Sequence, residues 1–511
     1  MIKELPWRLI FVLILLPLGV SLNAGEQETI QVDHADQLQQ REIEGQTLRI
    51  LTGNVQLQQD DITLKCDSAV QYIQQNEIEA WDNVHIKHGD SLHLYGDHLF
   101  YDGNKREAVM EGNVKMEEED MTLKTERLFY EVDEGKAYYR DKARILEGKN
   151  KLTSKTGYYF SENKNLEFKD SVRLDNPDFL LKSDTLHYHH PTSVATVHGP
   201  TRIDRKASRD YLYCERGWYN TDEGRARAYK NPYLWYEGSY LEADTLYLEE
   251  ATGYAEAKGN IHLNDTSENT SVYGHYAEYF DDRQYTYITD SASARSIMEE
   301  DTLYLSADTL IAKEDDTGEH SLFKAHHNVR SYHEDFQTDS DSLVYREKDS
   351  MLTLYNEPKA WLDSQQISAD TIRAKFDGEN IETMFLEGQA FLISPVGHDF
   401  YNQIKGLSMK GHFSNNELRR IEVSGNAEGI YFLKDEEERF VGVNRIEASE
   451  ISIEVVERQL NEITFSRSPD ANVYPMGRFD PGELILAGFR WNPQKMPLLP
   501  KGIFKDQNKL P

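Results

Sequence analysis

Residues 51–86, LTGNVQLQQDDITLKCDSAVQYIQQNEIEAWDNVHI, decide the fold class. Apolar and polar residues alternate through this stretch, as in Val55-Gln56-Leu57 and Ile62-Thr63-Leu64, and a period of two predicts strands with one buried face. Short polar segments such as Gln59-Asp60-Asp61 and Gln75-Asn76-Glu77 separate the alternating runs and are typical of hairpin turns. The stretch therefore predicts consecutive antiparallel strands joined by tight turns.

The triplet Gly53-Asn54-Val55 opens a series of similar triplets, which we call the first landmark. The first six copies begin 29 or 30 residues apart, and the later intervals reach 37 residues. A regular period of this length indicates a repeat architecture. The thirteen copies begin at Gly53, Asp82, Gly112, Asp141, Asp170, Gly199, Lys230, Gly259, Asp290, His327, Asn356, Gly388 and Gly425.

A second landmark, an Asp followed in most copies by Ser or Thr, lies about fourteen residues after the first. Its clearest copies are at Asp67, Asp97, Asp184, Asp244, Asp308, Asp341 and Asp370. Short polar residues in a strand interior favour a bend. We therefore expect an all-β protein in which about thirteen repeats of 29–37 residues form an elongated stack of bent antiparallel strands, a V-shaped trough on the order of 120 Å long. A β-sandwich or a parallel β-helix is the alternative.

The composition excludes some classes of function but does not identify one. The 511 residues include 89 Asp and Glu against 56 Lys and Arg, a net charge of −33, which argues against a nucleic-acid partner. Two cysteines exclude a disulfide scaffold. Because Cys66 and Cys214 fall five repeats apart, on the order of 50 Å in such a stack, we expect free thiols.

The first 24 residues predict a secretory signal peptide. Lys3 and Arg8 form a basic start, an apolar run spans residues 9–20, and Ser21 to Ala24 offer a cleavage site. Twelve apolar residues are short for a membrane-spanning helix, although a retained anchor is the alternative. We therefore expect an exported protein.

Catalytic and metal-binding motifs are not found in the sequence. It contains no Gly-x-Ser-x-Gly, no His-Glu-x-x-His and no P-loop, so we expect no enzyme and no cofactor. His187 and His189 share one strand face, but no third ligand of fixed spacing accompanies them, so we predict no metal site.

The start of the repeats resembles the OstA/LptA family of lipopolysaccharide-transport proteins. The resemblance rests on Ile30-x-Val32 and Asp36, then residues 51–57, then Ile62-x-Leu64 with Cys66-Asp67-Ser68. The segments 415–421, 442–445, 469–471 and 488–491 are similar to long OstA-like proteins of Bacteroidota. The family implies a β-taco or β-jellyroll fold and a periplasmic location, with outer-membrane association as a further option. Its implied partners are lipopolysaccharide and the outer-membrane assembly and inner-membrane transport components.

An apolar trough would suit acyl chains, since burial contributes about 0.8 kcal/mol per CH₂ group. The predicted lipid-binding groove consists of Val55, Leu57, Ile62, Leu64, Val84, Ile86, Val114, Met116, Leu123, Val172 and Leu174. With the family resemblance, this predicts a non-enzymatic carrier that shields lipopolysaccharide acyl chains on the way to the outer membrane. A structural or adhesive β-repeat protein of the cell surface is the alternative. Open strand edges would also allow end-to-end self-association.

We expect four segments along the chain. These are the signal peptide 1–24, the OstA-like repeats 25–200, further repeats of the same stack 201–465, and a C-terminal segment 466–511. Seven of the fifteen prolines lie in the last 47 residues, so this segment differs from the repeats. It is expected to cap the stack or to dock on a partner.

Overall fold

The computed structural model describes most of the chain as strands. The described residues are 29–298, 301–314, 321–378, 380–397, 400–437, 439–456, 459–477 and 484–499, so the predicted signal peptide 1–24 lies outside them. They contain 3₁₀ turns but no α-helix, and therefore none long and apolar enough to cross a membrane. The pairings between the described strands are antiparallel, and the all-β stack of bent strands is confirmed.

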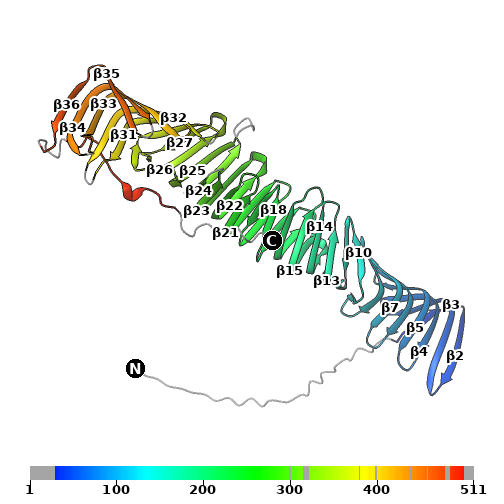
Figure 1. The fold of residues 1–511 in the computed structure, drawn as a ribbon. Helices are drawn as coiled ribbons and strands as arrows, with labels where there is room; N and C mark the ends of the chain where they lie inside the picture. The colour runs from blue at the N-terminus through cyan, green and yellow to red at the C-terminus, as the bar shows by residue number, and fades with distance from the viewer. Residues whose placement is uncertain are drawn as a thin grey trace, which may run out of the picture. The chain divides into compact units, whose positions relative to one another are not determined.

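The chain divides into two compact units. Unit 1 contains the residues up to Gly148 and Tyr158–Glu162, and unit 2 contains Lys149–Gly157 and the residues from Asn163 on. Figure 1 shows the strands of each unit side by side in chain order. The expected subdivision at residues 200 and 465 stays a prediction.

Unit 1 is a series of hairpins in which β3 to β8 each pair with the next strand. Both β9 and β10 pair with β8, because the strand is interrupted between them. The strands are β1 (Gln31–His34), β2 (Gln37–Ile43), β3 (Gln46–Gln59), β4 (Ile62–Tyr72), β5 (Glu77–His88), β6 (Leu92–Asp102), β7 (Glu107–Glu118), β8 (Met121–Glu131), β9 (Lys136–Tyr139) and β10 (Ala143–Glu147), followed by β12 (Thr156–Phe160) at the unit boundary.

Unit 2 continues the same pattern with longer strands toward its end. Its first half contains β11 (Asn150–Ser154), β13 (Asn165–Asp175), β14 (Phe179–His189), β15 (Val194–Arg205), β16 (Tyr211–Asn220), β17 (Arg225–Tyr229), β18 (Tyr233–Tyr236), β19 (Ser239–Glu242), β20 (Thr245–Glu249), β21 (Tyr254–Asp265), β22 (Thr270–Phe280), β23 (Tyr285–Ile297) and β24 (Thr302–Glu314). Its second half contains β25 (Ser321–Tyr332), β26 (Phe336–Arg346), β27 (Met351–Tyr355), β28 (Lys359–Leu362), β29 (Gln365–Ser368), β30 (Thr371–Asp377), β31 (Asn380–Pro395), β32 (Tyr401–Ser414), β33 (Glu417–Lys434), β34 (Phe440–Val456), β35 (Gln459–Ser466) and β36 (Asp470–Pro475).

Each first landmark is a corner in a strand. In the first copy, Gly53 has φ +77° and Asn54 has φ +46°, and the β3–β4 register moves from Thr52↔Ser68 directly to Val55↔Cys66. This is a β-bulge, in which extra residues on one strand bend the pair. All thirteen copies contain a residue with positive φ. Gly, Asn and Asp recur there because they tolerate the left-handed conformation best.

The two landmarks meet in the same corner, which the sequence did not reveal. The Asn83 side chain donates a 2.7 Å hydrogen bond to Asp67, and Asn113 donates one of 2.7 Å to Asp97 on the preceding strand. A Cβ on Gly53 would lie 2.3 Å from Asp36 Oδ2, so glycine allows the backbone to approach that carboxylate. Equivalent Asn-to-Asp bonds recur at Asn54–Asp36, Asn260–Asp244, Asn328–Asp308 and Asn356–Asp341.

The corners divide each strand into two portions. We call residues such as 55–66, between a first and a second landmark, leg one, and residues such as 68–81, between a second and the next first landmark, leg two. A fourteenth corner occurs at Arg467 (φ +61°) and Ser468 (φ +64°), where the Ser449 N–H donates to the Arg467 carbonyl at 3.3 Å. The strands therefore extend into the C-terminal segment 466–511, as far as Pro475 in β36.

Residues 484–499 pack on the outer face of leg one in unit 2. Leu486 is 1% exposed and joins a buried cluster with Phe391, Ile393, Ile430, Phe432 and Val443. Residues 390–393 of β31 are all buried, which shows that both faces of the strand are covered there. We call residues 484–499 the C-terminal strap.

Two buried glutamines hold the C-terminal strap by its backbone. The Gln403 side chain donates to the Leu484 carbonyl at 2.8 Å and accepts from the Leu486 N–H at 2.9 Å. Gln366 in the same way donates to the Arg490 carbonyl at 2.7 Å and accepts from the Asn492 N–H at 2.8 Å. Both glutamines are 1% exposed, so these bonds satisfy amides that burial would otherwise leave without partners.

Candidate functional site

The predicted groove residues all face the interior. The eleven side chains are between 0% and 5% exposed; nine lie in leg one of unit 1, and Val172 and Leu174 lie in β13 of unit 2. Within unit 1 they stack across the strands, since Leu57 is opposite Leu64 and Leu64 is opposite Ile86. That these side chains contact lipid stays a prediction.

Leg two contributes a second set of buried side chains to unit 1. They alternate along the strands as the period of two predicts, and they repeat with the corners. The set consists of Leu51, Ala69, Ile78, Ala80, Leu99, Met110 and Leu128, none more than 1% exposed. The interior of unit 1 is therefore apolar along both legs.

Each leg ends in turns, and we call the region where the turns of leg one lie close to those of leg two the mouth of the interior. Tyrosines from leg two connect the two legs there. The Tyr101 hydroxyl donates a 2.7 Å hydrogen bond to Gln59 at the end of β3. The Tyr130 hydroxyl lies 2.5 Å from Nδ1 of His88 at the end of β5, and Tyr159 hydrogen-bonds Glu118 at the end of β7.

Burial changes the acidity of these phenols. It raises the pKa of Tyr101 to about 12, and it also raises the pKa of Tyr130 and Tyr159. The hydroxyls therefore stay protonated and neutral at physiological pH. This row was not predicted from the sequence, although tyrosine recurs at 101, 130, 159 and 188 at intervals of 29 residues.

An arginine in a leg-two turn adds ionic links across the same mouth. Arg106, between β6 and β7, pairs with Asp60 and lies 3.4 Å from Asp61, both in the β3–β4 turn of leg one. It also lies 2.6 Å from Asp133 in the next leg-two turn. Its side chain is only 13% exposed, so these contacts are partly shielded from solvent. The turns that end the two legs are thereby held together.

The segment that precedes β1 closes part of the mouth. The Ile30 N–H donates to Asn76 Oδ1 at 3.0 Å, and the Gln71 side chain donates to the Ile30 carbonyl at 2.9 Å. Ile30 itself is 6% exposed. Unit 1 therefore has an apolar interior whose mouth is closed by polar contacts.

Residues 27–184 match the family model of the OstA-like proteins. The resemblance to this family is confirmed over that segment. A comparison with curated proteins gave no match. Among solved structures, the chain is similar to LptH of Pseudomonas aeruginosa, described as the LptA homologous periplasmic component of the lipopolysaccharide transport device, at 16% identity. The alignment covers 27% of this chain and 92% of LptH, with a TM-score of 0.21.

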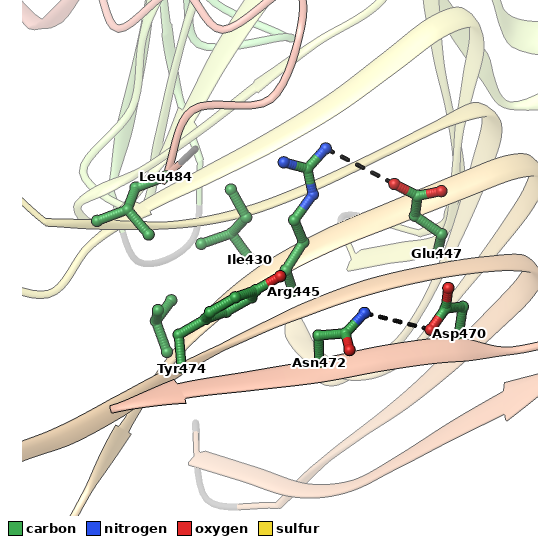
Figure 2. A pocket seen from close by; sticks show the side chains of 8 residues that line it. Ile430, Arg445, Glu447, Asp470, Asn472, Tyr474 and Leu484 are labelled. Carbon is green, nitrogen blue, oxygen red and sulfur yellow. Dashed lines mark hydrogen bonds and ion pairs between the residues drawn. The ribbon is translucent and has the colours of Figure 1, made fainter. Parts of the chain in front are cut away.

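Two cavities are found among the described residues. One, of about 240 Å³, is lined by Ile430, Val443, Arg445, Glu447, Asp470, Asn472, Tyr474 and Leu484. Figure 2 shows that its wall is largely polar, with Arg445 3.6 Å from Glu447 and Asn472 bonded to Asp470. The second, of about 570 Å³, is lined by Ser171, Val172, Arg173, Lys182, Ser183, Pro200, Thr201, Arg202, Tyr213 and Tyr233. The charged wall of the first cavity does not suit an acyl chain, whereas the second combines basic residues with the predicted groove residue Val172.

The cysteines and histidines do not form a metal site in the described parts of the chain. Cys66 and Cys214 are buried free thiols, as predicted, and burial raises the pKa of Cys66 to about 12. The His187 ring lies 4.9 Å from the His198 ring, and no three metal-binding side chains of the described residues gather.

Proposed function

We propose that this protein is a non-enzymatic periplasmic carrier that shields the acyl chains of lipopolysaccharide during transport to the outer membrane. The observation that carries the proposal is the apolar interior of unit 1, which repeats with every corner and is lined on both legs. The OstA-like match over residues 27–184 supports it.

Repetition gives such an interior a transport property. Leu57, Leu64 and Ile86 stand opposite one another on successive strands, so an acyl chain would meet similar apolar contacts at each step. Burial of hydrocarbon contributes about 0.8 kcal/mol per CH₂ group, which holds the lipid strongly overall. Because the binding free energy of the lipid would be similar at neighbouring positions, its movement along the interior would meet no large free-energy barrier.

Entry of a lipid requires the mouth to open. Breaking the Tyr101–Gln59 bond costs about 0.5–1.5 kcal/mol. The chains of one lipid contain many CH₂ groups, so their burial outweighs the loss of a few such contacts. The mouth would then separate the buried chains from a polar headgroup in solvent.

The proposal also specifies which components would exchange lipid with this protein. The carrier would receive lipopolysaccharide from inner-membrane transport components and deliver it to the outer-membrane assembly machinery. Pairing of exposed edge strands would join copies end to end. At the first strands of unit 1, Leu38 and Ile43 of β2 are 51% and 50% exposed, which supports contact there.

A structural or adhesive β-repeat protein is the second candidate. The observation in its favour is the near-complete burial of the groove residues, which pack against one another as an ordinary core would. A purely structural stack would never open to lipid.

Site-specific photocrosslinking in cells separates the two. A photoreactive residue at Leu64 or Leu123, which face the interior, should give lipopolysaccharide adducts. The control positions are Val70 and Phe129, which lie on the outer face of leg two in the same strands and should give none. Equal labelling at all four positions, or none at Leu64 and Leu123, would exclude the carrier.

A further inference from the structure

The outer face of leg one in unit 1 carries a row of basic residues. Lys65, His85 and Tyr95 are directly opposite one another on β4, β5 and β6. The register continues from Tyr95 to Lys115 on β7, from there to Lys124 on β8, and then to Arg144 on β10. We call these six residues the cationic ladder.

The cationic ladder follows from the repeat. His85, Lys115 and Arg144 each stand three residues after the start of a first landmark. Lys65 and Tyr95 each stand two residues before the Asp of a second landmark. Because side chains alternate along a strand, these positions point away from the buried Val84, Val114 and Ala143.

Most of the ladder's charge is uncompensated. Lys65, Lys124 and Arg144 are exposed, and none forms a salt bridge with another described residue. Lys115 is the exception, 2.9 Å from Glu117. In a chain with a net charge of −33, a row of four cations, three of them without a salt bridge to another described residue, is a local concentration of positive charge.

The middle of the ladder is ordered by ring contacts. The His85 and Tyr95 rings stack at 4.4 Å, and the Lys115 ammonium lies 4.4 Å from the Tyr95 ring centre on the next strand. These contacts hold the side chains upright in one line across the sheet. A ligand would therefore meet a row of hydrogen-bond donors.

The residues beside the ladder are polar. One flank carries Lys87, His93 and Glu117, and the other carries the corner carboxylates Asp67 and Asp97. The corner carboxylates already accept the hydrogen bonds of the landmark asparagines. The centre of a protein–protein interface is depleted of charge, so this surface fits a charged polymer better than a folded partner.

The same repeat positions in unit 2 show the opposite arrangement. Arg173, Lys182 and Arg202 are again opposite one another on β13, β14 and β15. Here Arg173 lies 3.0 Å from Asp175, and Arg202 and Lys182 lie 2.6 and 3.7 Å from Asp204. These cations are compensated within the sheet.

We propose that the cationic ladder is a binding site for a linear, phosphate-bearing polymer such as a phosphorylated polysaccharide. Donors recur at the strand spacing of about 4.8 Å, so a chain with regularly spaced anionic oxygens can contact several of them at once. The site lies on the face opposite the apolar interior, so it would anchor the protein to a polyanion independently of any lipid inside.

The test uses the full chain and labelled inorganic polyphosphate in fluorescence anisotropy titrations. The variant Lys65→Gln/Lys124→Gln/Arg144→Gln should bind about tenfold more weakly or worse, and wild-type affinity should fall steeply with salt. The matched control is Arg173→Gln/Lys182→Gln/Arg202→Gln, which changes the net charge equally and should keep affinity within about twofold. Circular dichroism checks that both variants fold.

Three results would overturn the proposal. Equal loss in both triple variants would show that only net charge matters. An absence of saturable binding of polyphosphate to the wild type at low salt would remove the site. Binding to phosphatidylglycerol vesicles but not to polyphosphate would assign the ladder to a membrane surface instead.

Discussion

At the scale of single residues, the corners depend on a few side chains that serve two purposes. Asn83 adopts φ +51° and also donates to Asp67 on the neighbouring strand. One residue therefore bends its own strand and fixes the adjacent one. Because the bond joins consecutive strands, each corner also sets the register of the next.

Replacement of Asn83 separates these two contributions. Asn83→Ala loses the hydrogen bond and places alanine, which tolerates the left-handed region less well than asparagine, at this corner, so the free energy of unfolding should fall by about 1–3 kcal/mol. Asn83→Gly loses only the hydrogen bond and should cost less. Urea denaturation followed by circular dichroism measures both. Equal effects would show that the backbone conformation adds nothing.

Buried acids predict an alkaline limit of stability. Burial raises the pKa of Tyr101 and that of Cys66 each to about 12, above unfolded values of about 10 and 8.5. Since the folded state keeps the proton longer, their contribution is complete at lower pH and is lost as the pH rises from about 8.5 to 12. Tyr101→Phe should reduce the fall in unfolding free energy between pH 9 and 11. Tyr229→Phe, at an exposed tyrosine, is the control, and identical slopes in both variants would contradict the assignment.

At the scale of elements, the two faces of one strand differ in chemistry, and the outer face also differs between repeats. In β4, Leu64 faces the interior while Lys65 belongs to the cationic ladder. In β31, both faces are buried because the C-terminal strap covers the outer one. One strand pattern thus supports an interior, a charged surface and a docking surface at different places along the chain.

Charges placed in the interior should block lipid binding. Leu64→Asp with Leu123→Asp puts two carboxylates among apolar side chains, where an acyl chain could not remain without contacting them. Lipopolysaccharide crosslinking through a photoreactive residue at Val84 should be lost. Thr63→Asp with Thr122→Asp adds the same charge on the outer face and should leave crosslinking intact. Unchanged crosslinking in the interior variant would contradict the proposed groove.

The glutamine contacts predict how firmly the C-terminal strap is held. Gln366→Ala with Gln403→Ala removes four hydrogen bonds to its backbone, so residues 484–499 should become several-fold more sensitive to limited proteolysis. Gln337→Ala is the control, since Gln337 is buried in the same sheet but donates to the carbonyls of His333 and Glu334. Mass spectrometry of the fragments locates the cleavage. Equal resistance in both variants would show that the apolar cluster around Leu486 holds the strap alone.

At the scale of the whole molecule, the acidic surface and the apolar interior are separated by the alternation of every strand. Among the described residues, Asp102 and Glu118 are the buried charged side chains, and both lie at strand ends. Clamping of lipid phosphates inside the protein is therefore not expected, because the interior lacks buried Lys and Arg among the described residues.

Depletion of the protein tests its role in the cell. A carrier should cause lipopolysaccharide to accumulate at the inner membrane when its expression is switched off, and fractionation of membranes on a density gradient measures this. Re-expression of the wild type should restore delivery, whereas the Leu64→Asp/Leu123→Asp variant should not. Normal delivery after depletion would support the structural alternative.

Local sequence patterns are sufficient to predict the strands, the turns and the corners. Alternation with period two and the residues Gly, Asn and Asp act locally, so Gly53-Asn54 and Asp82-Asn83 could be identified as bends without coordinates. The same alternation placed the eleven groove residues inside, and all of them are buried.

Contacts between residues far apart in the sequence are visible in the folded chain alone. The two landmarks join in one corner because neighbouring strands bring Asn83 to Asp67, and the mouth closes because Tyr101 reaches Gln59, 42 residues earlier. Gln366 binds the backbone of Asn492, 126 residues away, on a face that sequence alone predicts to be in solvent. Local patterns fix the direction of each side chain, but these contacts depend on how closely the two legs approach each other and on where the C-terminal strap lies, which no local pattern contains.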